Sequence, residues 1–94
     1  MKVFLIQQKQ LEVLNKEQKI LETRIQRVDL KKWLPLFEVA SDDGQKVCCS
    51  LRVQDTGEVR TWADLRLLAE WLREKLGITR CQLLLDDFEL PDTE

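Results

Sequence analysis

The 94-residue sequence predicts one small α+β domain that begins with a long amphipathic helix. Helix-forming residues fill positions 7–32, and neither glycine nor proline occurs before Pro35. Alternating apolar and polar residues follow an Asp-Gly turn signal at positions 43–44, which is typical of a β-hairpin. Apolar residues at helical spacing then recur over positions 62–76. The predicted order is helix, two or three strands, helix, strand.

The first helix is expected over residues 7–32, in an N-terminal helical region of residues 1–33. Its apolar positions follow the 3-4 spacing of a helix that buries one face. One polar residue, Gln18, interrupts the stripe. It resembles the polar core residues that set the register of coiled coils. We therefore predict self-association through this helix or packing on its own sheet. The stripe consists of Leu11, Leu14, Gln18, Leu21, Ile25 and Val28.

The remaining elements are placed by turn and cap signals. Residues 36–41 and 46–53 are expected to form the hairpin, with residues 58–60 as a third strand if the sheet is a meander. Thr61 is the expected N-cap of a second helix over residues 62–76, and Gly77 is its expected stop. A last strand is expected over residues 78–85.

An alternative order places a strand in residues 1–7. The chain would then be βαββαβ, which is a ferredoxin-like arrangement. In both orders residues 1–85 make a single domain, and residues 86–94 make an acidic C-terminal tail.

Charge is unevenly distributed although the net charge is only −2. Residues 1–33 hold eight basic and four acidic residues, whereas residues 86–94 hold five acidic residues and no basic one. This asymmetry predicts either charged partners at the two ends or two solvated surfaces. No apolar run approaches the ~20 residues of a membrane span, and residues 1–6 lack the features of a signal peptide. We therefore expect a chain that contacts no membrane. The odd number of cysteines, two of them adjacent, disfavours a disulfide scaffold, so we expect a reducing, cytoplasmic location.

The residue types present exclude most catalytic chemistry. The chain has no histidine, so it lacks the usual general base and the commonest nitrogen ligand for metals. Adjacent Cys48 and Cys49 are expected on opposite faces of a strand, and Cys49 and Cys81 are expected to be small buried side chains. The three glycines form no phosphate-binding loop. We predict no catalytic residue, no cofactor, no metal site and no small-molecule substrate.

Two further segments are candidates for binding a partner. An indole at the junction of the first helix and the hairpin, next to two lysines, is placed either to anchor a partner or to fill the gap between helix and sheet. The start of the acidic tail is the second candidate. The residues are Lys31, Lys32 and Trp33 in the first segment and Asp86, Asp87 and Phe88 in the second.

Together these observations predict a non-catalytic protein-interaction or regulatory module that forms a homodimer through its first helix. One alternative is a nucleic-acid-associated regulator that uses the basic residues of that helix, although interleaved acidic residues dilute the basic face. Another alternative is an inhibitor that docks its acidic half on a basic partner protein.

Overall fold

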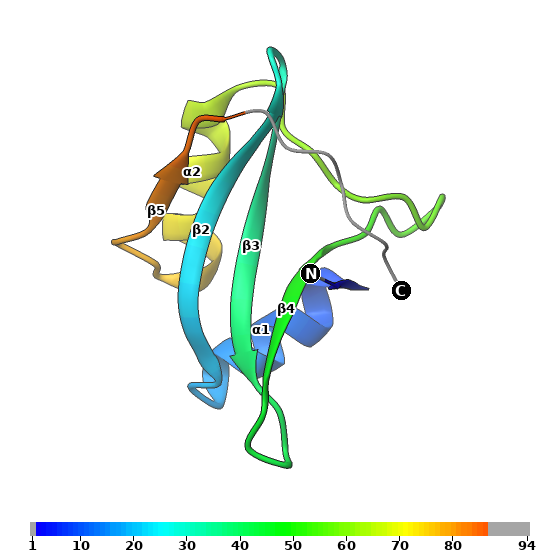
Figure 1. The fold of residues 1–94 in the computed structure, drawn as a ribbon, viewed down its shortest axis with the longest axis vertical. Helices are drawn as coiled ribbons and strands as arrows, with labels where there is room; N and C mark the ends of the chain where they lie inside the picture. The colour runs from blue at the N-terminus through cyan, green and yellow to red at the C-terminus, as the bar shows by residue number, and fades with distance from the viewer. Residues whose placement is uncertain (1, 87–94) are drawn as a thin grey trace.

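The structure, a computed structural model, describes residues 2–86 and confirms an α+β fold of two helices and a five-stranded mixed sheet (Figure 1). Within these residues no helix combines the length and the apolar character that crossing a membrane requires. The elements are β1 (Val3–Ile6), α1 (Gln8–Lys16), β2 (Ile20–Asp29), β3 (Lys32–Ala40), β4 (Lys46–Leu51), α2 (Leu65–Leu76) and β5 (Gln82–Leu84).

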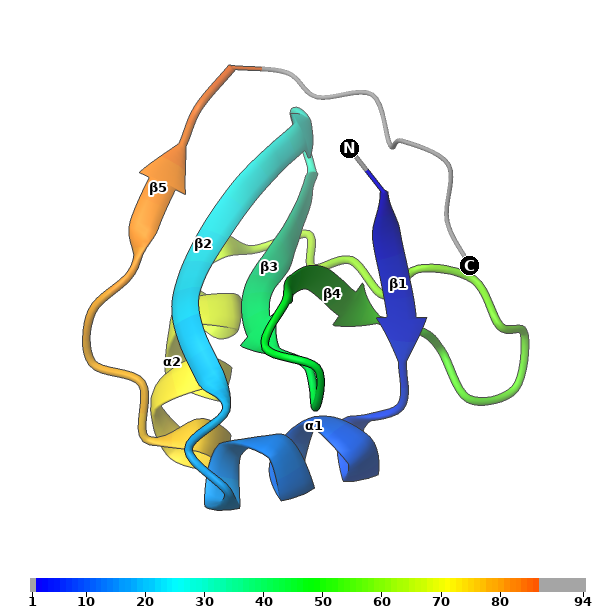
Figure 2. The same ribbon diagram turned by 60° about the horizontal axis from the view of Figure 1, so that its bottom comes forward.

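The sheet has the strand order β1-β4-β3-β2-β5, which Figure 2 shows from one edge to the other. Strands β2, β3 and β4 form an antiparallel meander. The edge strands are parallel to their neighbours: β1 pairs with β4, and β5 pairs with β2. Within residues 2–86, the first and last strands are therefore the two edges of the sheet.

Both helices pack on the same face of this sheet. Leu11 of α1, Leu68 of α2 and Phe37 of β3 belong to one buried cluster. The ends of the helices are joined where the Asn15 side-chain amide donates to the Leu76 carbonyl at 3.0 Å. A smaller apolar cluster lies on the opposite face and includes residues of β1 and β3. The central strand β3 thus has apolar side chains on both faces.

The predicted long N-terminal helix is wrong, because the chain reverses after Lys16. Gln18 adopts a left-handed conformation with φ 58°. Its backbone N–H donates to the Asn15 carbonyl at 3.1 Å, and the Lys19 N–H donates to the Leu14 carbonyl at 2.9 Å. These two bonds are those of a Schellman motif, which ends a helix with a residue that is usually glycine. Because glutamine occupies the position here, the sequence carried no visible helix stop.

Residues 20–29 form a strand although their apolar positions also fit a helical spacing. In β2, Ile25 faces the helices, whereas Val28, three residues later, packs with the cluster on the other face. β2 pairs with β3 along almost its whole length, and this tertiary pairing overrides the local preference. The alternative order came closer at the N-terminus, since β1 lies within residues 1–7, but three strands separate the helices rather than the two of a βαββαβ chain.

The predicted hairpin is confirmed as the antiparallel pair β3–β4, although β3 starts earlier than expected, at Lys32. It therefore contains Pro35, which has no N–H to donate. β3 pairs with β4 only from Phe37 to Ala40, so the proline lies outside that ladder. The expected third strand at residues 58–60 is a single bridge between Val59 and Arg52.

The second helix begins later than predicted and ends where predicted. The N-cap is Asp64 and not Thr61, because the Asp64 carboxylate accepts a hydrogen bond from the Arg66 backbone N–H at 2.8 Å. Gly77, with φ 67°, ends the helix. The predicted last strand over residues 78–85 is confirmed only for Gln82–Leu84.

Candidate functional site

The structure separates the six residues of the stripe that was predicted to mediate self-association. Leu11 and Ile25 are buried in the core under the helices, where Leu14 also packs. Gln18 lies in the turn after α1. Leu21 is exposed on β2, whereas Val28 packs on the opposite face of the sheet. These residues form no common surface, and a coiled-coil seam is therefore absent from this segment.

Trp33, one of the predicted partner-binding residues, packs against the core under the helices and is half-buried. Its backbone N–H and carbonyl exchange hydrogen bonds of 2.8 Å with those of Trp62. Trp33 lies in β3 and not at the end of a helix, so the junction at which it was expected to fill a gap or anchor a partner does not exist. Trp62 and Trp71 pack against the same core.

The charged candidates lie at two separate places. Lys31 and Lys32 are exposed at the turn between β2 and β3, where the Lys31 N–H donates to the Asp29 carboxylate at 3.0 Å. Asp86 is exposed after β5, and its carbonyl accepts a hydrogen bond from the Gln26 side chain at 2.9 Å. The other two predicted residues, Asp87 and Phe88, lie outside the described residues.

The basic residues of the first third are not carried by one helix, since Lys2 precedes β1 and Lys32 begins β3. The remaining six are distributed among α1, β2 and the turns that follow. Lys19 contacts Asp42 at 3.1 Å and Glu17 at 3.8 Å, and the hydrogen bond to Asp42 raises the pKa of the Lys19 ammonium group. The predicted nucleic-acid surface on a basic first helix thus has no continuous counterpart.

The outer edge of β5 offers both apolar side chains and free backbone groups. β5 pairs with β2 on one side and, among residues 2–86, has no strand on the other. Leu83 is 46% exposed, Leu85 is 59% exposed, and Cys81 is exposed as well. Of these three residues only Leu83 lies within β5, and Cys81 and Leu85 flank the strand on either side. If the extended backbone continues by one residue at each end, the three side chains lie on the same side. An edge of this kind is a template for pairing with another strand.

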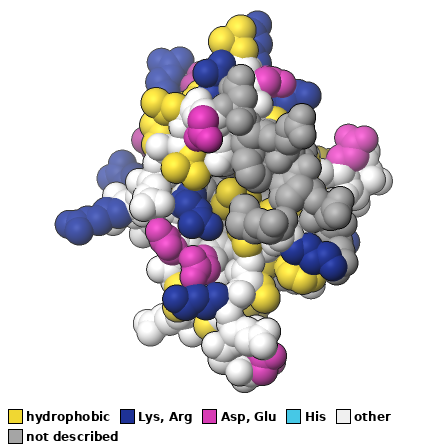
Figure 3. All heavy atoms as spheres, viewed as in Figure 1, with side chains coloured by type: hydrophobic (Ala, Val, Ile, Leu, Met, Phe, Trp, Pro, Cys, Tyr) yellow, Lys and Arg dark blue, Asp and Glu magenta, His cyan; other side chains and the backbone are white. Residues whose placement is uncertain are grey.

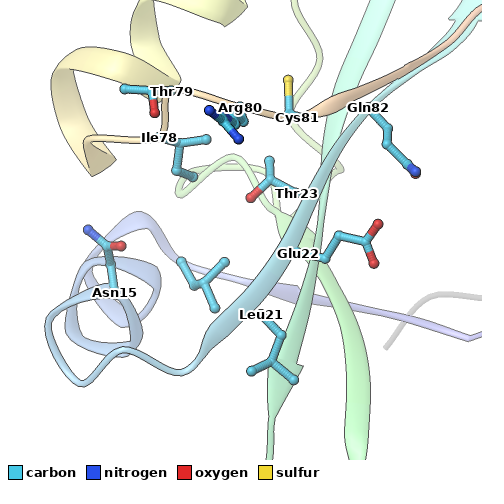
Figure 4. A pocket seen from close by; sticks show the side chains of 10 residues that line it. Asn15, Leu21, Glu22, Thr23, Ile78, Thr79, Arg80, Cys81 and Gln82 are labelled. Atoms are coloured by element: carbon cyan, nitrogen blue, oxygen red, sulfur yellow. The ribbon is translucent and has the colours of Figure 1, made fainter.

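A cavity of about 560 Å³ adjoins this edge (Figure 4). It lies between the end of α1, the first half of β2 and the segment that leads from α2 into β5. Thr23 and Ile78 face one another across it, whereas Glu22 and Gln82 point away from its centre. Arg80 also lines the cavity. Hydrophobic and basic side chains lie next to one another along the side of the molecule where Figure 1 places β5 (Figure 3).

All three cysteines are free thiols. Cys49 packs in the core under the helices and Cys48 packs on the opposite face, which confirms their predicted divergence. The predicted burial of Cys81 is wrong, because it precedes an edge strand and is exposed. Partial desolvation raises the pKa of the Cys81 thiol, so it is protonated at neutral pH. Residues 2–86 contain no cluster of three or more carboxylate or thiol groups that could hold a metal ion.

A comparison of the chain with protein-family models, curated proteins and solved structures found no match. The sequence predicts a strand over residues 78–85 but not that this strand lies at an edge of the sheet. The missing information was the strand order, because the sequence does not reveal that the last strand lies at an edge. Its signal in the sequence is the run of three leucines at positions 83–85, next to Asp86.

Proposed function

We propose that the chain is a non-catalytic protein-interaction module that self-associates through β5. Two copies of the edge strand would pair in antiparallel orientation and join their sheets into one. Pairing through β5 replaces the self-association through a helical stripe that the sequence predicts, because the residues of that stripe lie on different surfaces. The proposal rests chiefly on one observation: when residues 80–86 are paired with a reversed copy centred on Leu83, the charged ends match as Arg80 and Asp86, and apolar residues meet at positions 81, 83 and 85.

An antiparallel pair centred on Leu83 places that leucine opposite its own copy. Gln82 then lies opposite Leu84, and Cys81 lies opposite Leu85, so the exposed apolar side chains meet on one face. At each end of the pair, Arg80 of one copy lies opposite Asp86 of the other. A twofold axis makes both charge pairs equivalent, as in most homodimers.

The paired segment is short, so the association is expected to be weak and dependent on concentration. Interfaces that bury less than roughly 1,200 Å² in total are typical of transient contacts. Such a dimer would form at high local concentration, which suits a regulatory or scaffolding role. We also propose a reducing, cytoplasmic location, because Cys81 is a free thiol inside the proposed contact.

Sedimentation velocity over a wide concentration range tests the proposal. The unaltered chain should shift from monomer toward dimer, and Leu83→Glu should keep it monomeric because two carboxylates would face each other at the twofold axis. The matched control is Leu67→Glu on α2, which replaces a leucine that is 62% exposed and lies outside the proposed contact. Equal loss of dimer in both variants, or a monomer at all concentrations, would contradict pairing through β5.

Disulfide cross-linking tests the register of the pair. In a Cys48→Ala, Cys49→Ala background, Leu85→Cys should form an intermolecular disulfide with the native Cys81 of the other copy. Within one chain these two positions are four strand residues apart, about 13 Å, which is too far for a disulfide. Leu84→Cys is the control, because position 84 points to the opposite face and should remain unlinked. Equal cross-linking of both variants would refute this register.

A further inference from the structure

A second cavity, of about 570 Å³, lies at the opposite edge of the sheet and is independent of β5. We call it the basic cavity, because Lys9, Arg52 and Arg60 line it. Its walls are brought together where the Arg52 N–H donates to the Ile6 carbonyl at 3.0 Å, which extends the β1–β4 ladder up to the start of α1. The backbone N–H of Arg60 donates to the Leu51 carbonyl at 2.7 Å, and this bond brings Arg60 back beside the end of β4.

Arg60 is held in a fixed position at this cavity. The centre of its guanidinium group lies 4.4 Å from the ring centroid of Trp62 and 5.4 Å from that of Trp71. The two indole rings contact each other, with centroids 5.3 Å apart. One guanidinium N–H group donates to the Gln8 side-chain carbonyl at 3.3 Å. A half-buried arginine that is already ordered loses little conformational freedom when it binds a ligand.

The cations of the basic cavity are not paired with acidic side chains within residues 2–86. Among the described residues, no carboxylate lies within ion-pair distance of Lys9, Arg52 or Arg60. Glu12 is the one acidic residue among the described lining residues, and within residues 2–86 it too makes no ion pair. The described lining residues therefore carry an excess of two positive charges, in a chain whose net charge is −2. Like charges gathered in one cavity favour the binding of an anion.

We propose that the basic cavity binds the phosphate group of a small phosphorylated molecule. A phosphate monoester carries close to two negative charges at neutral pH, which matches the excess charge of the cavity better than one carboxylate does. The planar guanidinium groups of Arg52 and Arg60 suit bidentate contacts with phosphate oxygens. The side-chain amides of Gln7 and Gln54 also line the cavity, and they supply donors and acceptors for the rest of the ligand.

NMR titration of the isotopically labelled chain tests the site, with inorganic phosphate and adenosine monophosphate as separate probes. Both should shift the amide signals of residues 7–9 and the Arg60 side-chain signal, and tighter binding of the monophosphate would show that the amides contribute. Potassium chloride at equal ionic strength should leave these signals in place. Equal shifts with chloride, or shifts confined to other parts of the chain, would overturn the proposal.

Two variants distinguish this site from general charge attraction. Arg52→Gln removes an exposed guanidinium group whose side chain has no partner among the described residues, and it should weaken phosphate binding about tenfold. Arg60→Lys keeps the charge but loses the planar fork, and it should weaken binding as well. Arg73→Gln on α2, which removes one positive charge outside the cavity, should leave the affinity unchanged. Equal effects of Arg52→Gln and Arg73→Gln would refute the site, and melting curves verify that all variants fold.

Discussion

The turn at Gln18 gives the most direct test of the fold. The observed turn predicts that Gln18→Gly raises the free energy of unfolding, whereas a continuous helix predicts that it lowers it. Gln18 is exposed and has φ 58°. A residue other than glycine in this left-handed region costs roughly 1–2 kcal/mol. In Gln18→Gly that cost disappears, and about 0.5–1 kcal/mol of the gain is offset by the greater freedom of glycine in the unfolded chain. The variant should therefore be more stable by about 0.5–1 kcal/mol.

A continuous helix over residues 7–32 predicts the reverse, since glycine in a helix interior costs about 1 kcal/mol. Urea denaturation followed by circular dichroism measures the free energy of unfolding, and the melting temperature should rise by roughly 2–8 °C. Glu12→Gly, in the middle of α1, is the matched control and should destabilise the chain by about 1 kcal/mol. If Gln18→Gly lowered the stability as much as Glu12→Gly does, residue 18 would lie inside a helix and the Schellman motif would be wrong.

Three further predictions concern the core, a buried hydroxyl and a helix cap. Leu68→Ala should lower the free energy of unfolding by about 3 kcal/mol, because this leucine is fully buried between α2 and the sheet; a loss under 1 kcal/mol in urea denaturation would contradict that packing. Ser50→Ala should cost about 1–2 kcal/mol in the same assay, because the buried Ser50 hydroxyl donates to the Pro35 carbonyl at 2.6 Å; an unchanged stability would show that this carbonyl has another donor. Hydrogen bonds from Arg66 lower the pKa of the Asp64 carboxyl group, so its ionised form stabilises the fold above about pH 4, and this contribution is lost as the pH falls through the lowered pKa. Asp64→Asn should flatten that part of the acid dependence of the melting temperature, and an identical pH profile would argue against the cap.

The elements that were predicted correctly depend on interactions between residues close in the sequence. The reversal between β3 and β4 follows from the turn residues at positions 41–45, and the end of α2 follows from Gly77. The opposite orientation of Cys48 and Cys49 follows from the period of two in any strand. Each of these signals acts over a few residues, so none needs knowledge of the rest of the fold.

The elements that were missed depend on contacts between distant residues. A single extended residue, Gln7, separates β1 from α1, and the junction has no glycine or proline to mark it. The parallel pairing of β1 with β4 joins residues more than forty positions apart, and parallel pairing leaves no local turn signal. The sequence of residues 20–29 fits a helical pattern and a strand pattern equally well. The strand is selected because β3 pairs with it on one side and β5 on the other.

The same distinction applies to the two proposed sites. By itself the sequence determined the α+β class, the uneven distribution of charge and the absence of histidine. Only the tertiary structure made β5 an exposed edge, since strand order is set by long-range pairing. The tertiary structure alone also brought together the residues of the basic cavity. There Arg60 lies between Trp71 of α2 and Gln8 of α1. Composition and local pattern fix which groups the chain carries, whereas long-range packing decides which of them meet.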